Sequence, residues 1–328
     1  MEFVSPKKPK CFLSSDCDPM VTESLAALSN TASAWGKGSG EYRDALECLA
    51  ALCNVVAQEK LNSGDMTSSL LHLKLCLKLC KTKHVAGRLV FLKLRIRTLN
   101  NLACCLSRLG DHKKALRHLR AARNIEKTTA ASSDSAFDTH QNMCAVLSKM
   151  GRHEAALAHA EAALDVLQPL IPSLDPTMPE CSVPETPRSQ HAILRGALGC
   201  HNVASELWQL GRLKDAHQAF ECGLRLANTA VRGGVPQACA VAAQLAKGRD
   251  TALALLLCTD RSDEQVEPLV PEVHSPTRSS PQHSHTLGTN SPALSSRSTL
   301  LGTLQFQVPT HRRSRPDSVG AQPWAPPQ

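Results

Sequence analysis

One stretch of the sequence decides the fold: Arg97-Thr-Leu-Asn-Asn-Leu-Ala-Cys-Cys-Leu-Ser-Arg-Leu-Gly-Asp-His-Lys-Lys-Ala-Leu-Arg-His-Leu-Arg-Ala-Ala-Arg-Asn-Ile-Glu126. Before Gly110, apolar side chains recur at helical spacing, namely at Leu99, Leu102, Ala103 and Leu106. After Gly110 the same spacing returns, at Ala115, Leu119 and Ala122. Each set lies on one face of a helix, and glycine is the usual residue at a helix end. The stretch therefore predicts two helices joined by a tight turn.

The same pattern returns along the chain. Segments around Gly151 and Gly211 align with the stretch around Gly110, and a weaker copy surrounds Gly64, where Ser69 stands at a position that is Ala in the other copies. We therefore predict four helical hairpins, at about 44–83, 88–127, 135–168 and 191–229. The insert at 169–190 is rich in Pro, Ser and Thr, and it predicts a surface loop.

The flanking segments complete the predicted organisation. Residues 1–20 lack periodicity and are expected to be disordered, as is the Ser/Pro-rich tail at 260–328. A helix at 235–258 is expected to cap the apolar end of the array, which as a whole covers 21–259. The predicted fold class is all-α: an α-solenoid of helical hairpins with disordered N- and C-terminal segments.

Composition supports this prediction. Aromatic residues make up only 3% of the chain, and its apolar mass comes from small and aliphatic side chains, which suit closely packed helices. No apolar stretch approaches the roughly 20 residues that a membrane helix needs, and no secretory signal is visible. Many of the 14 cysteines fall in helical apolar patterns. We therefore expect an intracellular, cytoplasmic protein in a reducing compartment.

The positive charge is concentrated in one part of the chain. Between Leu70 and Lys127 the sequence holds 8 Lys and 7 Arg against two acidic residues, Asp111 and Glu126. A basic surface is expected from six of these residues: Lys74, Lys78, Lys113, Lys114, Arg117 and Arg120. Such a block favours an acidic partner, although a simple solvated face is also consistent with it.

The stretch 97–126 resembles a tetratricopeptide repeat (TPR), and its Asn-Asn-Leu-Ala at 100–103 resembles the repeats of kinesin light chains. The chain lacks the heptad region by which kinesin light chains join the motor, so a motor subunit is not implied. The resemblance implies that extended peptides bind a groove lined by the first helices of the hairpins. The residues expected to form this groove are Asn54, Arg97, Asn100, Asn101, Gln141, Asn142, His201 and Asn202.

Two roles are open for the asparagines of this set. An amide offers a donor and an acceptor, so a row of amides can pair with a peptide backbone without reading its side chains. The same amides could instead bond to one another and link adjacent repeats.

The sequence shows no catalytic motif, and we expect no enzymatic activity, no cofactor and no metal site. The predicted function is a protein-interaction adaptor or scaffold for extended peptide segments, acidic ones included. The alternatives are a permanent structural part of a cytoskeletal or ciliary assembly, and a basic nucleic-acid binder, which the scarcity of aromatics disfavours. In the tail, candidate phosphorylation sites are Ser275, Ser280, Ser291 and Ser314.

Overall fold

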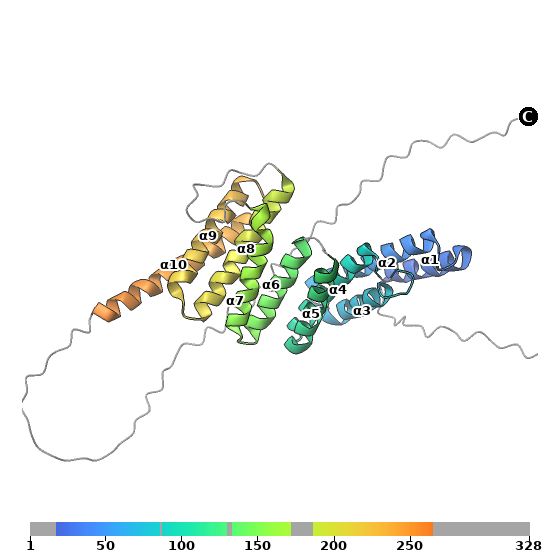
Figure 1. The fold of residues 1–328 in the computed structure, drawn as a ribbon, viewed down its shortest axis with the longest axis horizontal. Helices are drawn as coiled ribbons and strands as arrows, with labels where there is room; N and C mark the ends of the chain where they lie inside the picture. The colour runs from blue at the N-terminus through green and yellow to red at the C-terminus, as the bar shows by residue number, and fades with distance from the viewer. Residues whose placement is uncertain (1–17, 86, 130–132, 172–185, 265–328) are drawn as a thin grey trace, which may run out of the picture. The chain divides into compact units, whose positions relative to one another are not determined.

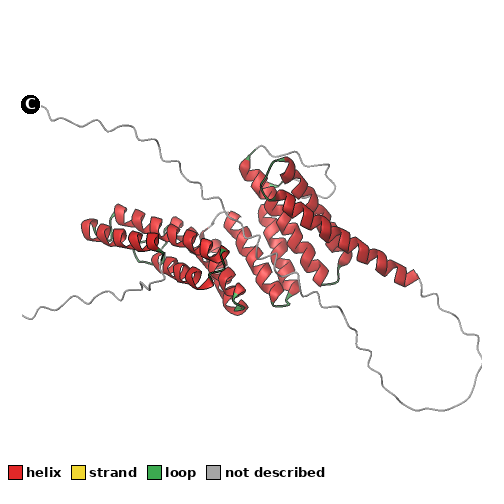
Figure 2. Cartoon of the chain, turned by 180° about the vertical axis from the view of Figure 1, so that it is seen from behind, coloured by secondary structure: helices red, strands yellow, loops and turns green. Residues whose placement is uncertain are grey.

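The computed structural model describes residues 18–85, 87–129, 133–171 and 186–264 (Figure 1). These residues form ten α-helices and one short 3₁₀ helix, and no strand occurs among them (Figure 2). The predicted all-α fold is confirmed. No helix in these ranges is both long enough and apolar enough to span a membrane.

Eleven helical elements follow one another along the described ranges. They are α1 (Pro19–Trp35), α2 (Gly40–Asn62), α3 (Met66–Leu79), α4 (Leu89–Arg108), α5 (His112–Thr129), α6 (Ser133–Lys149), α7 (His153–Leu167), η1 (Gln168–Leu170), α8 (Pro187–Gln209), α9 (Leu213–Arg232) and α10 (Ala238–Glu264).

The helices pair into four hairpins that stack in sequence. The hairpins are α2/α3, α4/α5, α6/α7 and α8/α9, while α1 packs on α2 and α10 packs on α9. Each first helix also contacts the next one, so that α2 meets α4, α4 meets α6, and α6 meets α8. Because every hairpin touches its neighbours in this regular way, the described residues form an α-solenoid.

Each hairpin turns at its predicted glycine. Gly64, Gly110, Gly151 and Gly211 all have positive φ, between 69° and 88°, where other residues are strained. At the second turn, the N–H of Asp111 donates to the Leu106 carbonyl at 2.9 Å, which satisfies a carbonyl that the helix end leaves without a partner. Bonds of the same spacing recur at the other three turns.

Small buried side chains let the helices approach closely. Ala115, Ala156 and Ala216 stand at the same position in three second helices, and each is fully buried. Ser69 occupies this position in α3, where its hydroxyl donates to the Ala57 carbonyl at 2.8 Å, so the polar atom is satisfied inside the core. The α8/α9 hairpin packs tightest around Gly223, where a Cβ would lie 2.9 Å from the Cβ of Cys200.

Three element boundaries differ from the prediction. Helix α1 begins at Pro19, inside the segment 1–20 that was predicted to be disordered. Helix α8 begins at Pro187, inside the predicted loop 169–190, because Thr186 caps it by accepting from the Ser189 N–H at 3.2 Å. Helix α10 continues to Glu264, into the segment predicted to be a disordered tail from residue 260. The rest of that tail, residues 1–17, and most of the insert loop lie outside the described residues.

Candidate functional site

The first helices bring polar side chains from successive hairpins to one face. Two repeat positions supply them. The inner amide row consists of Asn54, Asn100 and Gln141, and His201 stands at the same position in α8. The outer amide row consists of Asn101, Asn142 and Asn202, and Val55 stands at that position in α2. Asn54 and Asn100 are buried, whereas the outer row is half-buried.

At the first junction, between α2 and α4, the inner amide bonds to the next hairpin. The Nδ2 of Asn54 donates to the Thr98 hydroxyl at 2.8 Å and also lies 3.1 Å from the Sγ of Cys76. Thr98 in turn donates to the Leu94 carbonyl at 2.7 Å. The Nδ2 of Asn101 donates to the Oδ1 of Asn54 at 3.5 Å. The two amide rows are therefore joined across the repeat boundary.

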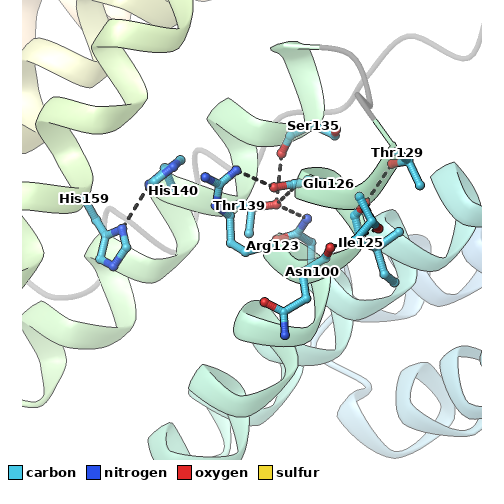
Figure 3. A network of polar contacts seen from close by, with 11 residues as sticks. Asn100, Arg123, Ile125, Glu126, Thr129, Ser135, Thr139, His140 and His159 are labelled. Carbon is cyan, nitrogen blue, oxygen red and sulfur yellow. Dashed lines mark hydrogen bonds and ion pairs between the residues drawn. The ribbon is translucent and has the colours of Figure 1, made fainter.

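The second junction, between α4 and α6, repeats this arrangement (Figure 3). The Nδ2 of Asn100 donates to the Thr139 hydroxyl at 2.9 Å, and the Nδ2 of Asn142 donates to the Oδ1 of Asn100 at 3.1 Å. Thr139 donates to the Oε1 of Glu126 at 2.6 Å. Glu126 is a buried carboxylate, and its other oxygen accepts from Arg123 at 2.8 Å. A charged group therefore anchors the end of this chain of hydrogen bonds.

The network fixes the orientation of the amides. A carbonyl or carboxylate oxygen can only accept, so Thr98 must donate to the Leu94 carbonyl, and Thr139 must donate to Glu126 or to the Ser135 carbonyl, which lies 2.9 Å away. Each threonine oxygen then accepts from an inner amide NH₂, and each inner amide oxygen accepts from an outer amide NH₂. The Oδ1 of Asn101 consequently has no partner among the described residues. The Oδ1 of Asn142 accepts only a long contact of 3.5 Å from Cys104.

The third junction, between α6 and α8, breaks the pattern. Asn202 still donates to the Oε1 of Gln141, but Gly199 stands where the earlier junctions have threonine. The Nε2 of Gln141 is buried and has no hydrogen-bond partner within the described ranges. A Cβ at position 199 would lie 3.4 Å from this nitrogen and 2.5 Å from the Cδ2 of Leu164. The longer glutamine and Leu164 thus take the space that a threonine would need.

A histidine pair lies beside the second junction (Figure 3). The Nδ1 atoms of His140 and His159 are 2.9 Å apart, which joins α6 to α7. Burial lowers the pKa of His140 to about 4, helped by the positive charges of Arg123 and Lys127 and by His159. Burial, Arg123 and Arg120 also lower the pKa of His159. Both imidazoles are therefore neutral at pH 7, and one can donate to the other.

The remaining predicted groove residues play other parts. Arg97 is exposed on α4. Its counterpart in α6 is Asp138, which accepts from Arg195 at 2.7 Å, and this interaction ties α8 to α6. The ring of His201 is half-buried and meets the Phe220 ring edge-on at 5.9 Å. The structure therefore groups the amides of the predicted set, whereas the exposed Arg97 has no hydrogen bond to them.

The predicted basic residues lie elsewhere in the fold. Lys74 and Lys78 are on α3, whereas Lys113, Lys114, Arg117 and Arg120 are on α5, and all six are exposed. They thus stand on second helices, away from the amide rows on the first helices. The serines at 275, 280, 291 and 314 lie outside the described residues. Within the described part of the chain, no group of three or more His, Cys, Asp or Glu side chains is arranged to hold a metal ion.

Three members of the network were absent from the predicted site: Thr98, Thr139 and Glu126. The two threonines carried a signal, because each stands two residues before the inner position of its repeat, at 98 and 100 and again at 139 and 141. Glu126 carried a weaker signal as one of only two acidic residues in the basic block. Its bond to the next hairpin depends on packing that the sequence pattern does not specify.

Comparison with known proteins finds a family model that matches part of the chain. A family model described as tetratricopeptide repeat matches residues 96–128, the part of the chain that holds most of α4 and α5. No curated protein matches the chain. Among solved structures, the chain is similar to the crystal structure of BtubC (BKLC) from P. vanneervenii, with 14% sequence identity and a TM-score of 0.46, over 82% of this chain and 100% of that one. The match shows a tetratricopeptide repeat at residues 96–128, and the other three hairpins share the turn geometry of this one.

Proposed function

We propose that this protein is a non-enzymatic adaptor or scaffold that binds an extended segment of another protein along the face of its first helices. The repeat fold itself supports a general role in protein interactions. The observation that carries the finer proposal is the outer amide row. Each of its NH₂ groups is held by the preceding hairpin, while its oxygen points away from that bond.

This arrangement suits a peptide backbone. An extended peptide presents N–H donors at regular intervals, and half-buried amide oxygens can accept them without reading the side chains. Because the NH₂ groups are already bonded, the oxygens are oriented before any peptide arrives, which reduces the entropy lost on binding. Linking the repeats and binding a peptide are therefore compatible roles for the same residues.

The proposal places the protein in the cytoplasm. Its support is that Cys76 and Cys80 are buried thiols that form no disulfide although their sulfurs lie 4.0 Å apart. Free thiols are typical of reducing compartments.

The test begins with peptides selected from a displayed random library against the full-length chain. Synthetic copies are then methylated at single backbone nitrogens, and binding is measured by fluorescence anisotropy. We expect methylation at alternate nitrogens to weaken binding at least tenfold. The substitution Asn142→Ala should weaken it similarly, and the exposed Asn228→Ala on α9 serves as the matched control.

Two results would count against the proposal. If selected peptides bind but no methylated nitrogen matters, the amides serve only to link the repeats. If repeated selection yields no peptide, the alternative of a permanent structural component is favoured instead.

A further inference from the structure

The outward face of α5 carries a basic stripe. Positions 113, 117, 120, 124 and 127 are separated by four, three, four and three residues, a spacing that keeps them on one side of a helix. All five are exposed, and four of them are basic: Lys113, Arg117, Arg120 and Lys127. At about 1.5 Å per residue, the stripe is about 21 Å long.

The equivalent positions of the two neighbouring repeats carry charges of opposite sign, positive in the preceding repeat and negative in the following one. At 46 residues earlier, the last three equivalent positions are Lys74 and Lys78 on α3 and Lys81 just after the end of this helix, and all three are exposed. On α7, 41 residues later, the exposed stripe includes Glu154, Glu161 and Asp165. The positive charge therefore covers two adjacent second helices and ends abruptly at the third.

The charges of α3 and α5 act on a common region. The pKa of His118 on α5 is lowered by burial, then by Arg117 on the same helix and by Lys81 at the end of α3. The two acidic residues of the block form their ion pairs with Lys114 and Arg123, which lie off the stripe, although the charge of Arg117 also helps to lower the pKa of Asp111. No described carboxylate lies within ion-pair distance of Lys113, Arg117 or Arg120.

We propose that this second-helix basic surface, formed by the stripes of α3 and α5, binds an acidic polypeptide segment. It lies on different helices from the amide rows, so it is a second binding surface and goes beyond the function proposed above. Its length of about 21 Å matches about six or seven residues of an extended chain. Acidic side chains at that spacing would meet several cations at once, which makes the interaction stronger than a single surface ion pair.

Two observations favour a polypeptide over a nucleic acid. The stripes of α3 and α5 carry no aromatic side chain on which a base could stack. The acidic stripe of α7 lies next along the repeats, where it would repel a phosphate backbone that ran on past α5. A short acidic segment confined to α3 and α5 avoids that repulsion.

The test uses the full-length chain and a fluorescein-labelled peptide of 14 glutamates, with affinity measured by anisotropy at 50 and 300 mM NaCl. We expect binding at the lower salt that weakens at least tenfold at the higher salt. The triple variant Lys113→Glu, Arg117→Glu, Arg120→Glu should weaken binding at 50 mM NaCl at least tenfold. The neutral variant Lys113→Gln, Arg117→Gln, Arg120→Gln gives the same test should the reversed variant fail to fold.

Two control variants separate a local surface from the net charge. The variant Arg152→Glu, Lys214→Glu, Lys247→Glu changes the net charge equally at exposed positions off the two stripes, and it should alter affinity less than twofold. Reversal of the α7 stripe by Glu154→Lys, Glu161→Lys, Asp165→Lys should strengthen binding. Equal losses in both glutamate triple variants would overturn the proposal.

A further binding measurement tests whether the same surface prefers a nucleic acid. A 14-residue oligouridylate is measured under the same conditions. The proposal is overturned if this oligonucleotide binds more tightly than the glutamate peptide and loses affinity in the α5 variant, because the surface would then be a nucleic-acid site. Weaker binding of the oligonucleotide supports the acidic polypeptide.

Discussion

The Nδ2 of Asn142 donates to the Oδ1 of Asn100 across 3.1 Å, so a side chain of the third hairpin completes the hydrogen bonds of a buried side chain in the second. The same relationship joins Asn101 to Asn54 one repeat earlier. Each buried inner amide therefore depends on the docking of the next hairpin, and the polar rows contribute to stability as well as to the proposed binding face.

The threonine of the second junction should be important for stability. Thr139→Val keeps the shape but removes the hydroxyl, which leaves the Nδ2 of Asn100 and a carboxylate oxygen of Glu126 without that partner. We expect the free energy of unfolding to fall by about 2 to 3 kcal/mol, measured by urea unfolding followed by circular dichroism. Thr128→Val is the matched control, because that exposed hydroxyl bonds only to backbone carbonyls of its own helix. Equal losses in the two variants would contradict the network.

The hairpin glycines should resist substitution. Gly110 has a φ of 82°, and nothing would crowd a Cβ there, so Gly110→Ala isolates the backbone strain. We expect a loss of about 1 to 2 kcal/mol in the free energy of unfolding. Gly38→Ala is the control, because that glycine is equally uncrowded and its φ is not positive. A loss at Gly110 no larger than at Gly38 would show that the turn tolerates other conformations.

At Gly223, steric crowding rather than backbone strain should determine the cost of a substitution by alanine. A Cβ there would lie 2.8 Å from the Cδ2 of Leu245, 2.9 Å from the Cβ of Cys200 and 3.2 Å from the Ala197 carbonyl oxygen. Two of these three neighbours belong to the rigid part of α8, so Gly223→Ala should force α9 away from it. We expect a loss of about 1 to 3 kcal/mol, read from the midpoint of thermal unfolding. The exposed Gln218→Ala on the same helix should leave that midpoint nearly unchanged.

The histidine pair predicts a pH dependence. The pKa of His140 is about 4 in the folded protein and about 6.5 in an unfolded chain, so the unfolded state takes up a proton first as the pH falls. Stability should therefore be unaffected by this group above pH 6.5 and should decrease from there towards pH 4. At pH 5 we expect a loss on the order of 1 to 2 kcal/mol.

The measurement is the unfolding midpoint between pH 7.5 and pH 4.5. His140→Gln removes the titrating group, so its midpoint should change less with pH than that of the natural sequence. Identical pH profiles for the two proteins would show that other groups account for the acid sensitivity.

The repeats were readable from the sequence because a glycine with positive φ must end each first helix and because small residues recur where helices cross. The helix boundaries were less readable. The Thr186-Pro187 pair was assigned to a Pro-rich loop, yet a threonine cap followed by proline is also a favourable helix start. The last turns of α10 carry no apolar period to reveal them, and no proline stops the helix before its end at Glu264.

The amide side chains of the site and their positions could be predicted from the sequence, but the partners and directions of its hydrogen bonds could not. The amide positions followed from the repeat alignment, whereas the donor direction depends on Thr98 and Thr139, and those in turn depend on a backbone carbonyl and on Glu126. The break at Gly199 could be seen in the alignment as a missing threonine. Its effect on Gln141 required the packing of Leu164.

Because position 199 is glycine where the earlier repeats have threonine, the repeat boundaries do not all share the same hydrogen bonds. A buried threonine hydroxyl links the hairpins at each of the first two repeat boundaries. The third boundary has no such hydroxyl, and its polar contacts include the hydrogen bond from Asn202 to Gln141, the Arg195–Asp138 ion pair and the contact between His153 and Glu206 at 2.8 Å. The four hairpins are consequently not interchangeable, because the hydrogen-bonding side chains of each one match those of its own neighbour. A shuffled or shortened array would misalign donors with acceptors even though every helix kept its own sequence.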